Sequence, residues 1–520
     1  MSSLRVLFLI LALGSGLLPA AEKAEHVLVV VWDGLRPDFV TEANTPTLFK
    51  LAARGTFFQN NHSQPITSTE VNGTVLATGC FPAHSGLIAN VEYRPALNPL
   101  KPMATENAQF IAQGDKLTQG KYLKVATLAE ILRGDKRLTA IAGTKPVVLL
   151  LDRAPRADAS DGSCCANLYQ GQTLPLELSA KLNAEFGVFP AEADSKKEAN
   201  IKQDQWTTKV FLEKLCADKL PTFATLWMSE GDYAQHGSGL GSEAALAGLK
   251  NCDDCLAQVL KKLETLGVLG QTDVIVVSDH GFSTISKCID IPDVLTKAGF
   301  NAAREYKEAP KPGEIVVVGL GGTVLLYVAN HDAETIKKLA RFLQEQDFTT
   351  ALFSREPVEG AFALKDVHLD SGDAPDLVLG LKWSADKSPL GVPGVITSEG
   401  LKRKPGQGNH ASFSPFDVHN TLIAAGPDFK AGLVNKTPTG NIDLAPTVLA
   451  ILGIKPPEAM DGRVLDEALV WGAPTPGEPE PAALEAQSEH EKFAWKQTLR
   501  LTKWQGRVYI EAAEGAATPK

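Results

Sequence analysis

Six acidic and imidazole residues follow apolar, β-branched runs of the chain or lie in the loops next to them. They are Asp33, Asp232, His236, Asp279, His280 and His410. Carboxylate and imidazole donors without thiolate suit Zn²⁺ or Mn²⁺. Each residue alone is explained as well by a turn, a helical neighbour or a solvated side chain. Because all six share a position near the ends of predicted strands, we interpret them as one metal site.

A hydroxyl-rich segment, Thr67-Ser68-Thr69, precedes a helical pattern over residues 70–77. A hydroxyl at a helix start faces unpaired backbone N–H groups, which favour an alkoxide or a bound phosphoryl oxygen. One of these residues is therefore a candidate nucleophile, although an N-cap without chemistry is the plain alternative. Six ligands and a hydroxyl suit two zinc ions, about 4 Å apart, for an in-line displacement at phosphorus. Metal coordination would activate the hydroxyl without a general base.

Buried strands are predicted at residues 26–32, 139–142, 147–151, 223–227 and 274–277. Helical patterns lie between them, at residues 45–54, 205–217 and 242–266. Alternating strands and helices predict an α/β fold with a doubly wound, mainly parallel sheet. Ligands of such sheets bind beyond the carboxyl ends of the strands, where the six candidate ligands lie.

The chain is expected to divide into six parts. They are a signal peptide (1–21), the first part of a catalytic α/β core (22–301), a small inserted α+β subdomain or lid (302–402), the second part of the core (403–472), a Pro/Glu-rich linker (473–488) and a C-terminal extension (489–520). The insertion is marked by short strands around a helix at residues 333–346. The extension carries Trp495, Trp504 and Tyr509, so we expect it to fold back on the body.

The N-terminal residues have the pattern of a secretory signal, with Arg5, an apolar run and cleavage near Ala20 or Ala21. No other stretch is long and apolar enough to span a bilayer. We expect an exported protein, periplasmic or extracellular, without a transmembrane anchor after cleavage. The net charge of -10 and the lack of a basic block argue against a surface that coats nucleic acid.

The seven cysteines are compatible with disulfides, but their odd number leaves at least one unpaired within the chain. Cys252 and Cys255 lie in a helical pattern without a second pair at zinc-finger spacing. We interpret them as a disulfide on a helix face or as two buried thiols.

Several motifs occur in an order that resembles the alkaline phosphatase superfamily, and its nucleotide pyrophosphatase/phosphodiesterase branch in particular. The resemblance spans residues 27–465. Its motifs are D-G-L-R-P-D from Asp33, N-T-P-T-L-F-K-L-A-A-R-G-T from Asn44, T-x-x-N at Thr69 and Asn72 followed by T-G, S-D-H-G from Ser278, and N-I-D-L-A-P-T-V-L-A-I-L-G from Asn441. It implies an alkaline-phosphatase-like fold.

The resemblance also implies roles for individual residues. One zinc ion would be held by Asp232, His236 and His410, and a second by Asp33, Asp279 and His280. Thr69 would attack phosphorus and bridge toward the second zinc, and Asn72 would donate to a phosphoryl oxygen.

The chain departs from the family pattern at two places. The nucleophile segment reads T-E-V-N-G where T-F-P-N-H is usual, so Val71 and Gly73 replace Pro and His. The segment Leu151-Asp-Arg153 resembles a K-x-R signature of monoesterases, with Leu151 in place of Lys. Arg153 alone could contact a phosphoryl oxygen, or it could form a structural salt bridge.

These features predict an exported two-zinc hydrolase of small-molecule phosphoesters. It would cleave phosphodiester or pyrophosphate bonds through a phospho- or nucleotidyl-threonine intermediate. A phosphomonoesterase of the same superfamily is one alternative. A metal-binding protein without catalytic activity is the other.

Overall fold

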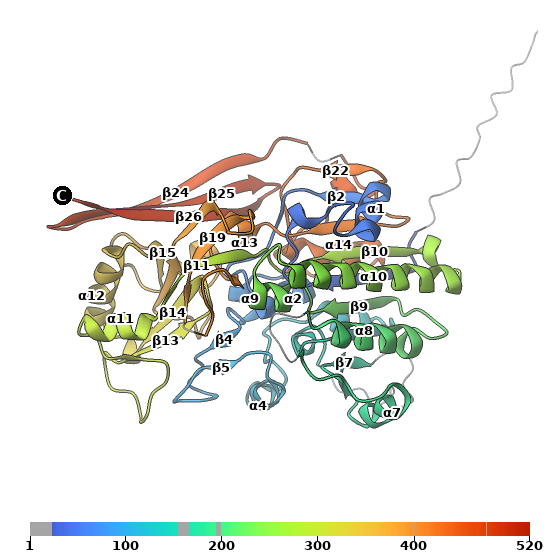
Figure 1. The fold of residues 1–520 in the computed structure, drawn as a ribbon, viewed down its shortest axis with the longest axis horizontal. Helices are drawn as coiled ribbons and strands as arrows, with labels where there is room; N and C mark the ends of the chain where they lie inside the picture. Colours follow the sequence, from blue (N-terminus) through green and yellow to red (C-terminus); the bar gives the residue numbers. More distant parts are fainter. Residues whose placement is uncertain (1–22, 154–165, 194–198, 401, 475) are drawn as a thin grey trace, which may run out of the picture.

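A nine-stranded sheet forms the core of the larger lobe, at the right of Figure 1. The computed structural model describes residues 23–153, 166–193, 199–400, 402–474 and 476–520. The predicted signal peptide, residues 1–21, lies outside them. The strand order is β22 (Leu433–Asn435), β2 (Thr56–Phe58), β21 (Leu422–Ala425), β10 (Thr272–Val277), β1 (His26–Trp32), β9 (Phe223–Met228), β6 (Thr139–Gly143), β7 (Asn167–Tyr169) and β8 (Gln172–Leu174). From β10 to β7 all neighbours are parallel, whereas β21 and β8 pair antiparallel.

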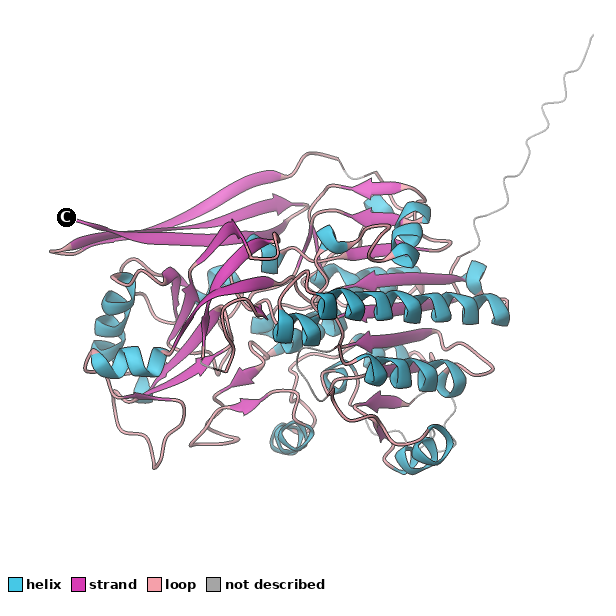
Figure 2. Ribbon diagram, in the orientation of Figure 1, coloured by secondary structure: helices cyan, strands magenta, loops and turns pink. Residues whose placement is uncertain are grey.

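Helices cover both faces of this sheet (Figure 2). One face carries α1 (Pro46–Arg54), α7 (Glu177–Phe186), α8 (Ile201–Val210) and α10 (Glu243–Leu266). The other carries α2 (Thr69–Thr78), α5 (Leu128–Gly134), α6 (Val148–Leu151) and α14 (Leu444–Ile451). The predicted doubly wound, mainly parallel α/β fold is confirmed.

The strand predicted at residues 147–151 is wrong, because this segment is the helix α6. A short, fully buried apolar run has no periodicity that separates a strand from one helical turn. Pro146 lies two residues before the helix start, and its carbonyl accepts from Leu149 N at 2.8 Å, which closes the turn. Asn167 of the neighbouring strand donates to the Val148 carbonyl at 2.9 Å, which fixes the turn against the sheet.

A second lobe is built on two smaller sheets (Figure 1). The six-stranded sheet has the order β12 (Ala302–Ala303), β13 (Ile315–Gly319), β14 (Thr323–Val328), β17 (Leu377–Leu381), β15 (Thr349–Ser354) and β16 (Phe362–Ala363), and α12 (Ala333–Gln344) packs on it. The four-stranded sheet contains β18 (Trp383–Lys387), β19 (Pro393–Glu399), β11 (Ser283–Ile289) and β20 (Gly408–Asn409). Because β11 and β20 belong to this lobe, it is longer at both ends than the expected 302–402.

The C-terminal segment forms a three-stranded antiparallel sheet of β24 (Glu480–Glu489), β25 (Phe493–Trp504) and β26 (Arg507–Pro519). Trp495, Trp504 and Tyr509 are buried, and the sheet packs on the second lobe through hydrogen bonds between Gln497 and the Leu352 backbone. The expected linker at 473–488 is therefore wrong from Glu480 onward. Cross-strand pairing with β25 outweighs the Pro/Glu-rich composition.

Shorter elements connect these units. They are β3 (Asn61–His62), β4 (Val91–Glu92), β5 (Met103–Ala104), β23 (Thr439–Gly440), α3 (Pro82–Ser85), α4 (Ala108–Thr118), α9 (Asp232–Ser238), α11 (Ile291–Lys297) and α13 (Pro415–Val418). Cys252 and Cys255 are buried thiols on α10. Among the described residues, no helix has the length and apolarity needed to cross a membrane.

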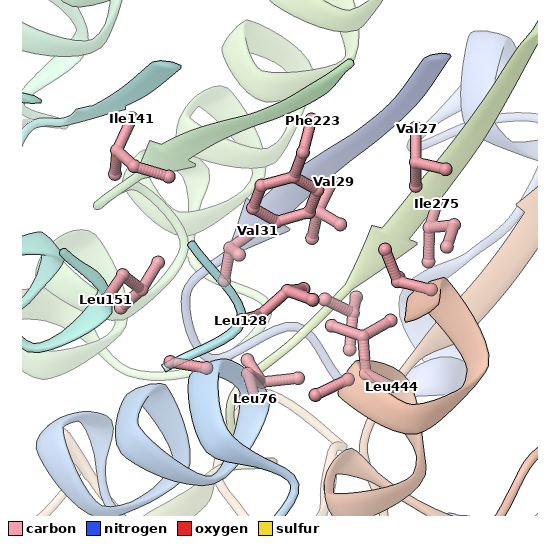
Figure 3. Packing of buried hydrophobic residues seen from close by; sticks show 14 of the residues in the cluster. Val27, Val29, Val31, Leu76, Leu128, Ile141, Leu151, Phe223, Ile275 and Leu444 are labelled. Carbon is pink, nitrogen blue, oxygen red and sulfur yellow. The ribbon is translucent and has the colours of Figure 1, made fainter. Parts of the chain in front are cut away.

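The sheet and α2 share one apolar core, in which Leu76 packs among Val29, Val31 and Leu128 (Figure 3). This packing fixes the helix whose first residue is Thr69.

We expect Leu76→Ala to lower the free energy of unfolding by about 2–5 kcal/mol, because it removes buried methyl groups and leaves a cavity. Urea denaturation measures the loss. Leu117→Ala, at a side chain that is 57% exposed, should stay within about 0.5 kcal/mol, and equal effects would contradict this account of the core.

Candidate active site

The six predicted ligands lie together at the carboxyl ends of the central strands. Asp33 follows β1, Asp232 opens α9 after β9, and Asp279 and His280 follow β10. His410 follows β20 of the second lobe. Metal-binding atoms lie within 4.8 Å of one another in two groups, Asp232 with His236 and His410, and Asp33 with Asp232 and His280. Asp279 is adjacent, since its Oδ2 lies 3.2 Å from His280 Nε2.

Each of the three histidines is oriented by a backbone carbonyl. Nδ1 lies 3.0 Å from the Gly408 carbonyl in His236, 2.8 Å from the Gly281 carbonyl in His280 and 3.0 Å from the Thr67 carbonyl in His410. A carbonyl only accepts, so Nδ1 carries the proton and the Nε2 lone pair faces the cluster. This is how histidines that bind metal ions are usually held.

Three carboxylate oxygens in the cluster are buried without a hydrogen-bond partner. They are Oδ1 of Asp33, Oδ1 of Asp232 and Oδ2 of Asp279. Leaving such an oxygen unpaired costs on the order of 1–3 kcal/mol or more. Together with the three inward Nε2 atoms, they form a donor set of oxygen and nitrogen that suits two ions of the zinc class. The residues present therefore fit the expected metal ions.

The buried charges shift one another's pKa values. Burial, followed by the neighbouring Asp279, raises the pKa of Asp33. Burial also opposes ionisation of Asp232, but His236 and Lys145 hold its pKa well below the usual range. The pKa of His410 is lowered by burial and by the two other histidines, so its ring stays neutral. The lowered pKa values of Asp232, His236 and His410 favour the deprotonated forms that metal binding requires.

Lys145 contributes a cation that the sequence reasoning missed. Its Nζ lies 2.7 Å from Oδ2 of Asp33 and 2.7 Å from Oδ2 of Asp232, and these carboxylates raise its pKa well above the usual value despite burial. The only sequence signal was its position just after β6, beyond the carboxyl end of a parallel strand.

Thr69 is the first residue of α2, and its Oγ1 lies 3.2 Å from His280 Nε2. Ser68 is the N-cap, with extended backbone and no side-chain capping bond. The Thr69 hydroxyl is thus placed between the helix start and the cluster, where the N-terminal dipole favours negative charge.

The structure does not support the predicted role of Asn72. Its side chain is fully buried, its amide nitrogen donates to the Gln64, Ile66 and Ser68 carbonyls, and its Oδ1 accepts from Gln64 N at 2.7 Å. These bonds use the amide to shape the loop before Thr69. No donor remains for a phosphoryl oxygen.

Asn90 borders the site. It lines a cavity of about 640 Å³ together with His236 and His410. Its Oδ1 accepts from Glu70 N at 3.1 Å, which turns its amide nitrogen away from the helix start. No sequence motif marked it, because asparagine is common in turns and the preceding residues, Gly86-Leu-Ile-Ala, carry no functional pattern.

Arg153 does not join the cluster. Its guanidinium lies 2.9 Å from Asp115 Oδ2 and 3.8 Å from Glu130 Oε1, and it donates to the Gly120 carbonyl. Of the two roles expected from the sequence, Arg153 therefore has the structural salt bridge and not the phosphoryl contact.

The same cavity separates the cluster from the second lobe. Its far side is formed by Arg304, Gly321, Lys402 and Arg403, with Glu399 and Asp290 beside Arg304. Arg403 donates to the His236 carbonyl, so this basic wall is joined to α9. The second lobe therefore forms one side of the site.

A profile of the Type I phosphodiesterase / nucleotide pyrophosphatase family matches residues 27–386. The chain belongs to this family, whose members hydrolyse phosphodiester or pyrophosphate bonds. Among curated proteins, it is 21% identical to bis(5'-adenosyl)-triphosphatase enpp4 of Mus musculus over 436 residues, which is 83% of this chain and 78% of the relative. The Homo sapiens ENPP4 is likewise 21% identical, over 431 residues.

Solved structures with the same fold include two ectonucleotide pyrophosphatase/phosphodiesterases 5. The murine protein, an inactive variant in complex with AMP, matches with a TM-score of 0.58 and 15% identity over 85% of this chain and 99% of its own. The human protein matches with a TM-score of 0.56 and 15% identity over 86% of this chain and 100% of its own. These likenesses confirm the alkaline-phosphatase-like fold.

The position of Asn90 predicts a donor to bound substrate. Asn90→Asp keeps the acceptor for Glu70 N but replaces the donor with a negatively charged oxygen. We expect kcat/KM for bis-p-nitrophenyl phosphate to fall about 100- to 1000-fold, the usual cost of losing one donor to developing charge. Asn107→Asp is the matched control, because aspartate caps α4 as well as asparagine does. Wild-type turnover in Asn90→Asp would exclude this role.

Proposed function

We propose that this protein is an exported, two-zinc phosphodiesterase or pyrophosphatase that works through a covalent intermediate on Thr69. The single observation that carries the proposal is the cluster of unpartnered carboxylate oxygens and inward Nε2 atoms beside the Thr69 hydroxyl. The proposed ligand sets are Asp232, His236 and His410 for one ion, and Asp33, Asp279 and His280 with Thr69 for the other. Mn²⁺ has the same ligand preferences.

When bound, the two ions lower the pKa of the hydroxyl and neutralise the leaving oxygen. The side chains of the protein position the reacting groups. Thr69 Oγ1 forms the bond to phosphorus while the bond to the leaving group breaks, and water then attacks the same phosphorus and releases Thr69. The Oδ1 atom of Asn90 accepts from Glu70 N, so its amide nitrogen would be the donor to a phosphoryl oxygen. In support, the murine relative's variant with one threonine replaced by alanine is described as inactive.

The basic wall of the cavity supports a leaving group that carries negative charge. Lys402 and Arg403 are on the wall opposite the cluster, and neither has an acidic partner among the described residues. The second phosphate of a pyrophosphate bond would be attracted to this wall. The related ENPP4 is named for the hydrolysis of a dinucleoside triphosphate, which has such a leaving group.

Removing the nucleophile should separate catalysis from metal binding. We expect Thr69→Ala to lower turnover at least about a thousandfold, because it removes the hydroxyl that lies 3.2 Å from His280 Nε2 at the helix start. Zinc content, measured by plasma mass spectrometry, should stay at the wild-type value. Ser68→Ala removes the adjacent hydroxyl, which only contacts the Ile66 carbonyl, and should change turnover less than about threefold. Retained activity in Thr69→Ala would remove Thr69 from the mechanism.

A wild-type protein with tight zinc and no turnover would favour the non-catalytic alternative.

A phosphomonoesterase remains the second candidate function because of Lys145. Its ammonium group lies between Asp33 and Asp232, and the Thr69 hydroxyl faces the same cluster. A terminal phosphate carries one more negative charge than a diester, so a cation at this point favours monoesters selectively. Arg153 does not add to this effect, since it is held by Asp115.

Comparing bis-p-nitrophenyl phosphate with p-nitrophenyl phosphate separates the two functions. We expect the diester to be the better substrate, and a monoester preference above about a hundredfold, ~2.7 kcal/mol, would overturn that choice. Lys145→Met should lower monoester turnover about tenfold more than diester turnover, as expected for one lost charge contact. Arg153→Met serves as the control and should leave the ratio unchanged. An unchanged ratio in Lys145→Met would exclude a role of this cation in selecting substrates.

A further inference from the structure

Three side chains with metal-binding atoms meet where the C-terminal sheet lies on the core, apart from the catalytic residues. They are His62 of β3, His419 directly after α13, and Glu511 of β26. Their ligand atoms all lie within 4.8 Å of one another. Glu511 places Oε1 3.2 Å from His62 Nε2 and Oε2 3.1 Å from His419 Nε2. Three distant segments of the chain thus contribute one donor each.

The His62 ring shows that this cluster is not a simple hydrogen-bonded contact. The ring is buried, and its Nδ1 lies 2.8 Å from the Thr439 carbonyl. The carbonyl only accepts, so Nδ1 carries a proton and Nε2 points toward Glu511. Nε2 lies 3.2 Å from Glu511 Oε1 but makes no hydrogen bond of acceptable geometry in the described part of the chain. A bound cation would satisfy a buried ring nitrogen placed in this way beside a carboxylate and a second imidazole.

The distances fit a small divalent ion. Zinc bonds to nitrogen and oxygen of about 2.0–2.2 Å place neighbouring ligands of a tetrahedron roughly 3.3–3.6 Å apart. One ligand atom from each of the three residues lies within 4.8 Å of the others, so small side-chain movements bring them to this spacing. Thr502 donates to Glu511 Oε1 at 2.6 Å, and the Thr439 carbonyl orients His62. Such outer hydrogen bonds are typical of metal ligands. Two imidazoles and a carboxylate suit Zn²⁺ better than Mg²⁺ or Ca²⁺.

We propose that His62, His419 and Glu511 form a third metal site, which binds Zn²⁺ and joins the C-terminal sheet to the core. Water has access to the fourth position, because a cleft of about 570 Å³ lined by Pro415, Thr502 and Glu511 opens beside it. The His419 and Glu511 side chains are 25% and 23% exposed, so the ion lies at the edge of the protein.

The site has a structural consequence for catalysis. His62 directly precedes the loop that leads to Thr69, and Glu511 lies in the last strand of the chain. Tyr509 of the same strand donates to Asp443 Oδ2 at 2.9 Å, which is a second link between the sheet and the core. An ion bound only in the folded state stabilises this junction by mass action.

Diffraction at the zinc absorption edge tests the proposal directly on crystals of the wild-type protein soaked in zinc chloride. We expect an anomalous peak between His62, His419 and Glu511, in addition to peaks at the catalytic cluster. Absence of a peak there in soaked crystals would overturn the proposal. This test needs no variant, so it stands even where a substitution prevents folding.

Metal analysis of two matched variants provides a second test. Glu511→Gln should contain about one zinc equivalent less than the wild type, because an amide is a poor zinc ligand. Glu514→Gln makes the same change of charge on the same strand, at an exposed carboxylate beside Arg500, and should keep the wild-type content. Equal zinc content in Glu511→Gln and the wild type would contradict the site.

A catalytic-site variant separates this proposal from the proposed function. His410→Ala should lose one zinc equivalent at the catalytic cluster and keep the peak at His62. If His410→Ala kept its full zinc content while Glu511→Gln lost one equivalent, the catalytic assignment would fail and the third site would stand. The reverse result would remove the third site alone.

Discussion

The structure depends on the burial of carboxylate oxygens that no donor in the described part of the chain satisfies. Asp33, Asp232 and Asp279 each have one such oxygen at the carboxyl edge of the central sheet. In a folded protein this arrangement persists only where a cation compensates it, because burying unpaired negative charge is costly. Lys145 supplies part of that charge, and the inward Nε2 atoms of three histidines define where the remaining positive charge must lie.

The proposed nucleophile and the proposed ligands are held by one network of hydrogen bonds. The Thr67 carbonyl orients His410, and the Asn72 side chain shapes the loop between Gln64 and Ser68. Trp227 Nε1 donates to Asp33 Oδ2 at 3.0 Å, so the strand that precedes Asp232 also fixes the first ligand. A small displacement of the Thr69 loop would therefore disturb a ligand as well as the hydroxyl. This coupling explains why the site is built on rigid, buried elements.

The second lobe and the C-terminal sheet add what the central sheet does not provide. The lobe contributes His410 and, with Lys402 and Arg403, the basic wall that we propose attracts the leaving part of the substrate. The C-terminal sheet packs on this lobe and reaches the core at His62. Fold likeness to the ENPP5 structures extends over most of the chain and does not by itself define the substrate.

The sequence by itself determined the fold class and the ligand types. Amphipathic helices have strong periodicity, and the buried strands are continuous apolar runs that end shortly before Asp33, Asp232, Asp279 and His280. Only the tertiary structure decided which side chains face the reaction. From the sequence alone, Asn72 and Asn90 are equally plausible donors to substrate, and Arg153 and Lys145 are equally plausible cations of the site. The structure separates them, because the hydrogen-bond partners of a side chain come from segments distant in the chain. The helix at 148–151 and the strand at 480–489 were decided in the same way, since packing and strand pairing outweigh local composition.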